Sequence, residues 1–228
     1  MKIVVCVKET VDTAAALSLQ NGEVFRGDAS LIINPWDEFA VEAALLLTEE
    51  HGGEVIALSV GGGEKNEALK HALAMGCREA VQIGIPGGVL QQTPAAILLA
   101  AAVRKIPDVD LVFFGRQSTD LESGVTPAQT ARMLNWPALT HTAKILSFSS
   151  DGQLLDVERL LEEGRQRARA ALPAVVSVVK EICEPRYPSF MGIRKAARVE
   201  VPRWEAADLG VSTDPSWRLG GISSPESR

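Results

Sequence analysis

A polar loop between an apolar run and a helix start is the stretch whose residue types are best suited to chemistry. Residues 111–114, LVFF, read as a strand buried on both faces, and Gly115 follows where the backbone must turn. Thr126 and Pro127 pair a cap residue with a first-turn proline, which predicts a helix from there to about Leu134. Residues 115–126 would then lie at the end of a strand beside a helix N-terminus, whose N–H groups attract anions. The loop is either a nucleotide site of the kind that open α/β sheets form, or an ordinary surface loop.

The cysteines and histidines of the chain are scattered along the sequence. They are Cys6, Cys77 and Cys183, and His51, His71 and His141. The cysteines form no CxxC pair, and no group of these residues has the clustered spacing that metal sites need. We therefore expect neither a disulfide framework nor a metal site, and assign these residues structural or surface roles.

Composition narrows the class of protein. The 228 residues are 46% hydrophobic, which is ample for a buried core. Asp and Glu outnumber Lys and Arg by 29 to 23, so binding to nucleic acid is not expected. The N-terminal apolar run before Lys8 is too short for a signal peptide or a membrane span. We expect a cytoplasmic protein without direct membrane insertion.

The elements that position the loop alternate between strands and helices. Buried strands are expected at residues 2–7, 55–60, 80–83 and 111–114. Helices are expected at residues 34–50, where Asn34 would cap and Pro35 would open the first turn, at 64–75 before Gly76, from Thr93-Pro94 to about Arg104, and from Thr126. This order predicts an α/β fold with a doubly wound, mostly parallel sheet and helices on both faces. The three glycines at residues 61–63 lack the spacing of a phosphate-binding fingerprint.

Two regions depart from this alternation. Residues 18–33, with Asn21-Gly22 at their centre, predict a small hairpin. Residues 143–148, 154–159 and 165–172 predict a small antiparallel hairpin region, in which Arg165, Arg167 and Arg169 share one exposed face. The apolar run at 174–179 should then return to the main sheet.

The last quarter of the chain contains apolar residues that a solvated loop would rarely carry. Tyr187, Phe190, Met191 and Ile193 lie close together in a proline-containing loop followed by a basic helical turn, so this segment is either a partner contact or an ordinary loop. Residues 205–228 show little periodicity and are expected to be frayed or laid on a partner.

Several strings, taken together and in order, resemble the β subunit of electron transfer flavoproteins. They are VCVKETVD, INPWDEFAVEAAL, ALAMG, GRQSTD, VERLLEEGRQRARAALPAVVSV and EPRYPSFMGIRKA. The fifth is the most specific, because Arg159, Glu162, Glu163, Gly164, Gln166 and Pro173 match the family signature. Ala168 stands where the family usually has a larger aliphatic residue.

The resemblance implies a fold like that of adenine nucleotide alpha hydrolases, as one domain over residues 1–228 with a partner-recognition loop at about 184–195 and a C-terminal arm at about 205–228. It also implies a heterodimer with an α subunit, a redox FAD shared with that subunit, and AMP or a second FAD in this one. Electrons would come from flavin-dependent dehydrogenases and leave to a quinone oxidoreductase or another acceptor. No catalytic residues are implied.

The resemblance carries two sets of site residues onto this chain. The nucleotide site would comprise Cys6, Asn34, Pro35, Trp36, Asp37, Val60, Gly115, Arg116, Gln117, Ser118, Thr119, Asp120, Leu121, Glu122, Ser123, Gly124, Val125 and Thr126. The recognition loop would present Tyr187, Phe190, Met191 and Ile193, with Phe190 at the place of the family's leucine-like anchor.

Departures within the loop leave the identity of the nucleotide open. Leu121, Val125 and Pro127 differ from the family pattern, and the choice is between a structural AMP and a second FAD that bifurcating members reduce with NADH. A regulatory α/β protein that binds ATP and forms homodimers is an alternative of a different class, since fold alone does not decide function.

Overall fold

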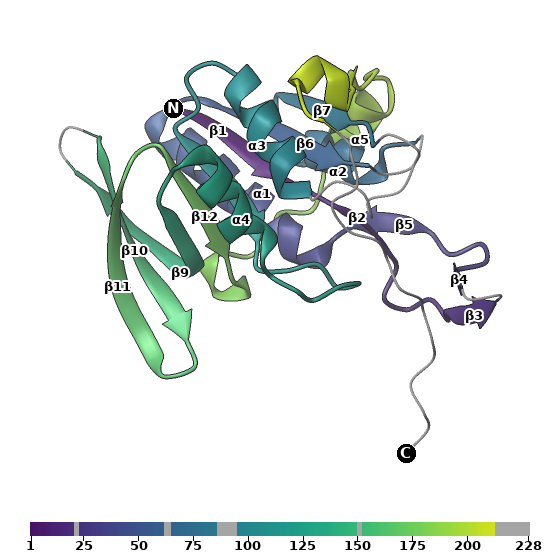
Figure 1. The fold of residues 1–228 in the computed structure, drawn as a ribbon, viewed down its shortest axis with the longest axis horizontal. Coiled ribbons are helices and arrows are strands. Elements are labelled where there is room, and N and C mark those ends of the chain that lie inside the picture. Colours follow the sequence, from purple (N-terminus) through teal and green to yellow (C-terminus); the bar gives the residue numbers. More distant parts are fainter. Residues whose placement is uncertain (21–22, 62–64, 86–94, 150–151, 213–228) are drawn as a thin grey trace.

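The computed structural model describes residues 1–20, 23–61, 65–85, 95–149 and 152–212. Within those residues the main sheet has nine strands. Their bounds are β1 Lys2–Cys6, β6 Glu54–Val60, β7 Glu79–Ile83, β8 Leu111–Gly115, β9 Ala138–Phe148, β10 Leu154–Leu161, β11 Gly164–Ala171, β12 Ala174–Val178 and β13 Arg203–Trp204. They lie in the order β11-β10-β9-β12-β8-β1-β6-β7-β13 (Figure 1). The neighbouring strands from β9 to β13 pair in parallel, whereas β10 is antiparallel to β9 and β11. The predicted mostly parallel sheet is confirmed.

The continuous apolar runs occupy the centre of this sheet. Every residue of β8 and β12 is buried, and β1 lies between β8 and β6 with only Lys2 partly exposed. Strands in this position have a helix over each face, so both rows of side chains must be apolar. The strands expected at residues 111–114 and 174–179 are therefore confirmed in the places expected for them.

Helices cover both faces of the sheet (Figure 1). Their bounds are α1 Pro35–His51, α2 Glu67–Met75, α3 Ala95–Lys105, α4 Thr126–Leu134 and α5 Phe190–Ala197. The buried side chains of α1 and α2 share one apolar core with Ile3, Val5 and Phe113, and those of α3 and α4 share a second core with Val4 and Phe114. Alternate residues of β1 and β8 thus face the two helical layers, as the pleat of a strand requires.

Helix starts were predicted to within a few residues. Pro35 opens α1 after Asn34, but the Asn34 side chain makes no capping bond. Thr126 is the first residue of α4 and not its cap, which is Val125. The second helix begins at Glu67, later than expected, because Asn66 before it adopts a left-handed conformation. The predicted cap at Thr93-Pro94 lies outside the described residues.

An extension of two small two-stranded sheets leaves the body beyond β1. Strand β2, Glu9–Val11, pairs with β5, Leu31–Ile33, and β3, Ser18–Gln20, pairs with β4, Glu23–Phe25. In Figure 1 this extension and the β10–β11 hairpin lie on opposite sides of the body. The predicted hairpin strands are confirmed, while the turn residues Asn21 and Gly22 lie outside the described ranges.

The three alternating arginines lie on β11, at the edge of the main sheet. All three side chains are more than half exposed, which confirms the expected exposed face. Arg167 and Arg169 pair with Asp156 of β10, and Arg165 pairs with Glu158. The Arg169 hydrogen bond and the nearby Arg167 hold the pKa of Asp156 at about 2, well below its ordinary value. The hairpin therefore supplies counter-charges for its own cations.

The segment after residue 202 departs from expectation. Trp204 forms β13 with Arg203, and main-chain bonds run from Gln82 N to Pro202 O at 2.9 Å and from Gly84 N to Trp204 O at 2.8 Å. A 3₁₀ turn, Ala206–Leu209, follows and buries Ala206. Strand β13 thus pairs with the edge of β7, and the turn that follows it is anchored to the core by Ala206. A partner contact by the arm that begins at about residue 205 stays a prediction. Residues 213–228 of the predicted arm lie outside the described part.

Candidate functional site

The predicted nucleotide residues meet where β1, β8 and β6 end. These strands are parallel, so Cys6, Gly115 and Val60 lie at the same edge of the sheet. The side chains of Cys6 and Val60 are buried in the core under α3 and α4. Only their main chain is left to line the edge, so any contact that they make with a ligand would be through backbone atoms.

Gly115 allows the first turn of α1 to approach the end of β8. A Cβ atom placed on Gly115 would lie 2.5 Å from Asp37 Oδ1 and 2.6 Å from the carbonyl oxygen of Trp36. Contacts this short to backbone cannot be relieved by rotating a side chain. A residue with a Cβ atom would therefore not fit at position 115. Glycine allows residues 34–37 to pack against the polar loop.

Asn34 fastens the loop in place of capping its own helix. Its Nδ2 donates to Gln117 O at 2.9 Å, and its Oδ1 accepts from Thr119 N at 3.2 Å. Its backbone N–H also donates to Lys8 O at 2.8 Å. The prediction that the Asn34 side chain caps α1 is wrong, because two main-chain groups of the loop compete for the same amide. The side chain instead joins two segments that were both assigned to the nucleotide site.

Asp37 is a buried carboxylate between two strand ends. Its Oδ2 accepts from Lys8 N at 2.8 Å, and Gly115 N is a second backbone donor. Burial raises the pKa of Asp37 to about 7, although hydrogen bonds from Asn34, Lys8 and Gly115 act in the opposite direction. Proton uptake and the positions of three chain segments are therefore linked at this residue.

Lys8 joins the end of β1 to the loop from the solvent side. Its Nζ lies 2.7 Å from Asp120 Oδ1 and 2.5 Å from Asp120 Oδ2. Partial burial acts to raise the pKa of Asp120, but hydrogen bonds from Lys8 and Ser118 outweigh it and hold that pKa below its ordinary value. Both side chains are partly exposed, so Asp120 holds the ammonium at the surface of the loop, where a phosphate group could also contact it.

Arg116 of the loop and Arg159 of β10 both lie close enough to His141 to influence its charge. The Arg116 guanidinium lies 5.8 Å from the centre of the Trp36 ring, and Arg159 donates to Thr140 O at 2.7 Å. His141 has a φ of 58° and a buried Nδ1 atom that has no hydrogen-bond partner in the described part of the chain. Partial burial and the charges of Arg116 and Arg159 lower the pKa of His141, which favours its neutral form.

The rest of the loop faces solvent. Leu121 is 72% exposed, and Glu122 and Gly124 both have positive φ. Glu122 N donates to Ser118 O at 2.9 Å, which folds the middle of the loop back on its start. Helix α4 then begins without a side-chain cap, so its first N–H groups are free to meet an anion.

Sequence reasoning ended the first strand just before Lys8 but did not assign Lys8 to the site, and it treated His141 as a structural or surface residue. Lys8 stands next to predicted site residues at the end of a buried strand, which was a usable signal. His141 carries no local signal, because its neighbours Arg116 and Arg159 are distant in sequence.

A hollow of about 830 Å³ lies away from this edge, between α1 and β9. Leu46, Leu47, Ile145 and Phe148 are among its lining residues, and none of the predicted nucleotide residues lines it. It therefore does not mark the nucleotide site.

The predicted recognition residues cluster on and before α5. Tyr187 is 97% exposed, Phe190 73%, Met191 71% and Ile193 52%. An apolar group of this kind on a short element is typical of a contact surface. Its use by a partner stays a prediction, as does the role of each residue assigned to the nucleotide site.

Comparison with known proteins identifies relatives along most of the chain. A family model described as electron transfer flavoprotein domain matches residues 24–209. The electron transfer flavoprotein subunit beta of Bacillus subtilis is 33% identical over 94% of this chain and 82% of its own length. The protein of the same name from Mycobacterium tuberculosis is 37% identical, over 93% and 82%. The caffeyl-CoA reductase-Etf complex subunit CarD of Acetobacterium woodii is 33% identical, over 94% and 82%.

Gly115→Ala should destabilise the site edge, because the new methyl group would meet Asp37 and the Trp36 backbone. We expect a loss of about 1–3 kcal/mol in the free energy of unfolding, measured by chemical denaturation. Gly152→Ala is the control, since nothing lies within 4 Å of its added atom and only the strain of its φ of 68° remains, about 1 kcal/mol. Equal losses in the two variants would contradict the close approach.

Asp37→Asn should remove a pH dependence from the unfolding free energy. The pKa of Asp37 is raised on folding, so its ionisation weakens the native state as pH rises from about 4 to about 7, by up to about 1.4 kcal/mol per pH unit. The stability of the unsubstituted protein relative to Asp37→Asn should therefore fall across this range and level off above it. Denaturation at several pH values measures this, and a relative stability that rises with pH would show that the carboxylate is held ionised.

Proposed function

The chain belongs to the electron transfer flavoprotein β-subunit family, and from that membership we propose that it pairs with an α subunit in a heterodimer that passes electrons from flavin-dependent dehydrogenases to a quinone oxidoreductase or another acceptor. The FAD shared between the subunits would supply the redox centre. This chain would bind and orient the cofactors and shield them from solvent, and it would supply no catalytic acid, base or nucleophile of its own. We place this function in the cytoplasm.

The observation that carries the proposal is the junction of Asn34, Asp37 and Gly115 at the carboxyl ends of parallel strands. Ligands of open α/β sheets bind at this edge, where loops and helix N-termini converge. Two helices, α1 and α4, begin here without side-chain caps. The N-terminal N–H groups of α4, together with the Lys8 ammonium, suit the phosphates of an adenine nucleotide.

We assign this edge to AMP or to a second FAD. Leu121 and Val125 are exposed on the loop and would face either ligand or the α subunit. Trp36 is half-buried beside Arg116 and is suited to cover an aromatic ring. Mass spectrometry of the nucleotide released from the purified heterodimer decides between them, and a colourless homodimer that releases ATP would overturn the proposal.

The α subunit would contact the strands that extend from the main sheet. Residues 143–179 expose Leu146 and the arginines of β11, and the hollow between α1 and β9 adjoins them. Surfaces of this mixed character are usual in stable heteromeric interfaces. In the described ranges no helix is both long enough and apolar enough to cross a bilayer, and electrons would reach a membrane acceptor through transient contact.

Asp120→Ala should weaken retention of the adenine nucleotide, because the Lys8 ammonium loses the partner that holds it over the loop. Lost charged hydrogen bonds cost about 1.5–3 kcal/mol, so nucleotide should be depleted after gel filtration. Glu79→Ala removes the same charge at the opposite edge of the sheet and serves as the control. Equal nucleotide content in Asp120→Ala and the unsubstituted heterodimer would refute a role for Asp120.

Phe190→Ala should impair electron transfer from the dehydrogenase while leaving the flavin spectrum and heterodimer assembly intact. An exposed aromatic that fills a pocket on its partner contributes at least about 2 kcal/mol of binding, or about thirtyfold in affinity. The measurement is the rate of flavin reduction at subsaturating dehydrogenase.

Phe25→Ala, which removes another exposed phenylalanine on β4, is the control for this experiment. A rate for Phe190→Ala equal to that of the unsubstituted heterodimer would place the anchor elsewhere. Loss of flavin from Phe190→Ala would show that the residue is structural.

A further inference from the structure

Helix α5 is short, and it presents most of its apolar side chains to solvent. It has eight residues, and Ala196 is its buried residue. Isolated helices of this length are marginal in water. Contacts outside the helix must therefore fix the direction in which Phe190 and Met191 point.

One such contact joins α5 to α2. A Cβ atom on Gly192 would lie 2.4 Å from Ala74 O, so the two helices approach closely at a glycine. Ser189 caps α5 by accepting from Gly192 N at 3.0 Å. These interactions hold the middle and the start of α5, and leave the chain before it to be fixed by something else.

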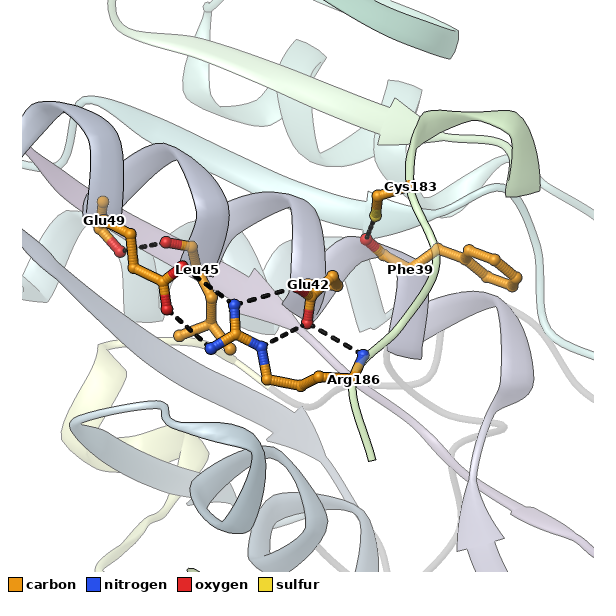
Figure 2. A network of polar contacts seen from close by, with 7 residues as sticks. Phe39, Glu42, Leu45, Glu49, Cys183 and Arg186 are labelled. Carbon is orange, nitrogen blue, oxygen red and sulfur yellow. Dashed lines mark hydrogen bonds and ion pairs between the residues drawn. The ribbon is translucent and has the colours of Figure 1, made fainter. Parts of the chain in front are cut away.

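Arg186 fixes that preceding chain to α1, as Figure 2 shows. Its Nε and Nη2 donate to Glu42 Oε2 and Oε1 at 2.7 and 2.9 Å, and its Nη1 and Nη2 donate to Glu49 Oε1 and Oε2 at 2.7 and 3.1 Å. Its backbone N–H also donates to Glu42 Oε2 at 3.2 Å. Cys183 Sγ approaches Phe39 O at 3.6 Å on the same helix. One guanidinium thus makes two paired contacts with carboxylates two helical turns apart.

The inner contact is protected from solvent. Glu42 is 4% exposed, so its carboxylate would be left uncompensated if the guanidinium withdrew. The hydrogen bond from Arg186 lowers the pKa of Glu49, and the hydrogen bonds that Arg186 donates to Glu49 and Glu42 raise its own pKa. These shifts favour the charged forms of Glu49 and Arg186, and the planar, two-pronged geometry of both contacts is one that lysine cannot reproduce.

We propose that Arg186 is a positioning residue, which with Glu42 and Glu49 sets the apolar group of Tyr187, Phe190, Met191 and Ile193 in its docking arrangement before a partner arrives. The proposal rests on the function proposed above. Arg186 immediately precedes Tyr187 and lies four residues before Phe190, so its attachment limits the motion of both. Ordering this segment in advance removes a cost that docking would otherwise bear.

The test uses Arg186→Lys in the purified heterodimer, with two readouts. Hydrogen exchange of the amides in residues 186–197 should become at least about fivefold faster, with the rest of the chain unchanged. The KM for a flavin-dependent dehydrogenase, reduced by its own substrate, should rise about fivefold to tenfold, while kcat at saturation and flavin content stay as they were.

Two further variants keep the test decisive. Glu49→Gln weakens only the outer, half-exposed contact and should give changes in the same direction of about twofold to threefold. Arg203→Lys, which replaces an arginine of β13 that pairs with Glu205 at 2.6 Å and makes no contact with Glu42 or Glu49, should change neither readout. Unchanged exchange in both Arg186→Lys and Glu49→Gln, or loss of flavin from both, would overturn the proposal.

Combining Arg186→Lys with Phe190→Ala separates this proposal from the one on which it rests. If Arg186 acts through the apolar group, the two effects on KM will be less than additive. Faster exchange in Arg186→Lys with an unchanged KM, while Phe190→Ala raises KM, would overturn the positioning role alone. An unchanged KM in Phe190→Ala as well would overturn the recognition function and, with it, this proposal.

Discussion

The buried carboxylate of Asp37 is the interaction on which the edge of the sheet depends. It accepts backbone N–H groups at the ends of two neighbouring strands, from Lys8 after β1 and from Gly115 in β8. Because Asp37 belongs to the first turn of α1, these bonds fix the helix relative to both strands at once. A buried backbone donor without an acceptor is costly, so each of the three segments holds the other two in register. The Gly115 loop, Asn34 and Lys8 all take their positions from this junction.

The same helix carries the second set of charged contacts. Glu42 and Glu49 are seven residues apart, which places them on one face of α1, two turns from each other. That face lies away from the junction and receives Arg186, whereas Asp37 faces the strand ends. The candidate nucleotide site and the segment before α5 are thus both attached to the same helix, α1. Helix α1 is also unusually apolar, and its burial against the sheet gives both sets of contacts a common frame.

The sequence predicted what depends on local pattern. Apolar runs located the central strands, and Thr126 and Pro127 located the start of α4, because strand burial and helix initiation leave their marks within a few residues. The order of elements was enough to predict the parallel sheet and the edge at which the strand-end loops meet. The residues assigned to that edge do lie together, although their roles came from resemblance and not from spacing.

Contacts between distant segments were not predicted, because their partners lie far apart in the sequence and leave no local pattern. The Asn34 amide has two possible uses, and the loop that captures it lies more than 80 residues further along the chain. Lys8 and Asp120 are 112 residues apart, so nothing near either residue reveals the pair. Strand β13 has two residues, too few for any periodicity, and it forms because β7 offers unpaired backbone groups. In each case the deciding partner is supplied by the tertiary fold.

The strand-end edge and the apolar group near α5 are built from different kinds of atoms, and this affects how each can tolerate substitution. The strand-end edge is made of backbone groups and buried side chains such as Asp37, so a substitution there disturbs several segments together. The apolar group on α5 consists of exposed side chains that support little else, because Ala196, Gly192 and Arg186 hold the helix. Tyr187, Phe190, Met191 and Ile193 are therefore free to vary with the shape of a partner while the support stays constant. Because support and exposed surface are separate in this way, the apolar group can change without disturbing the strand-end edge of the sheet.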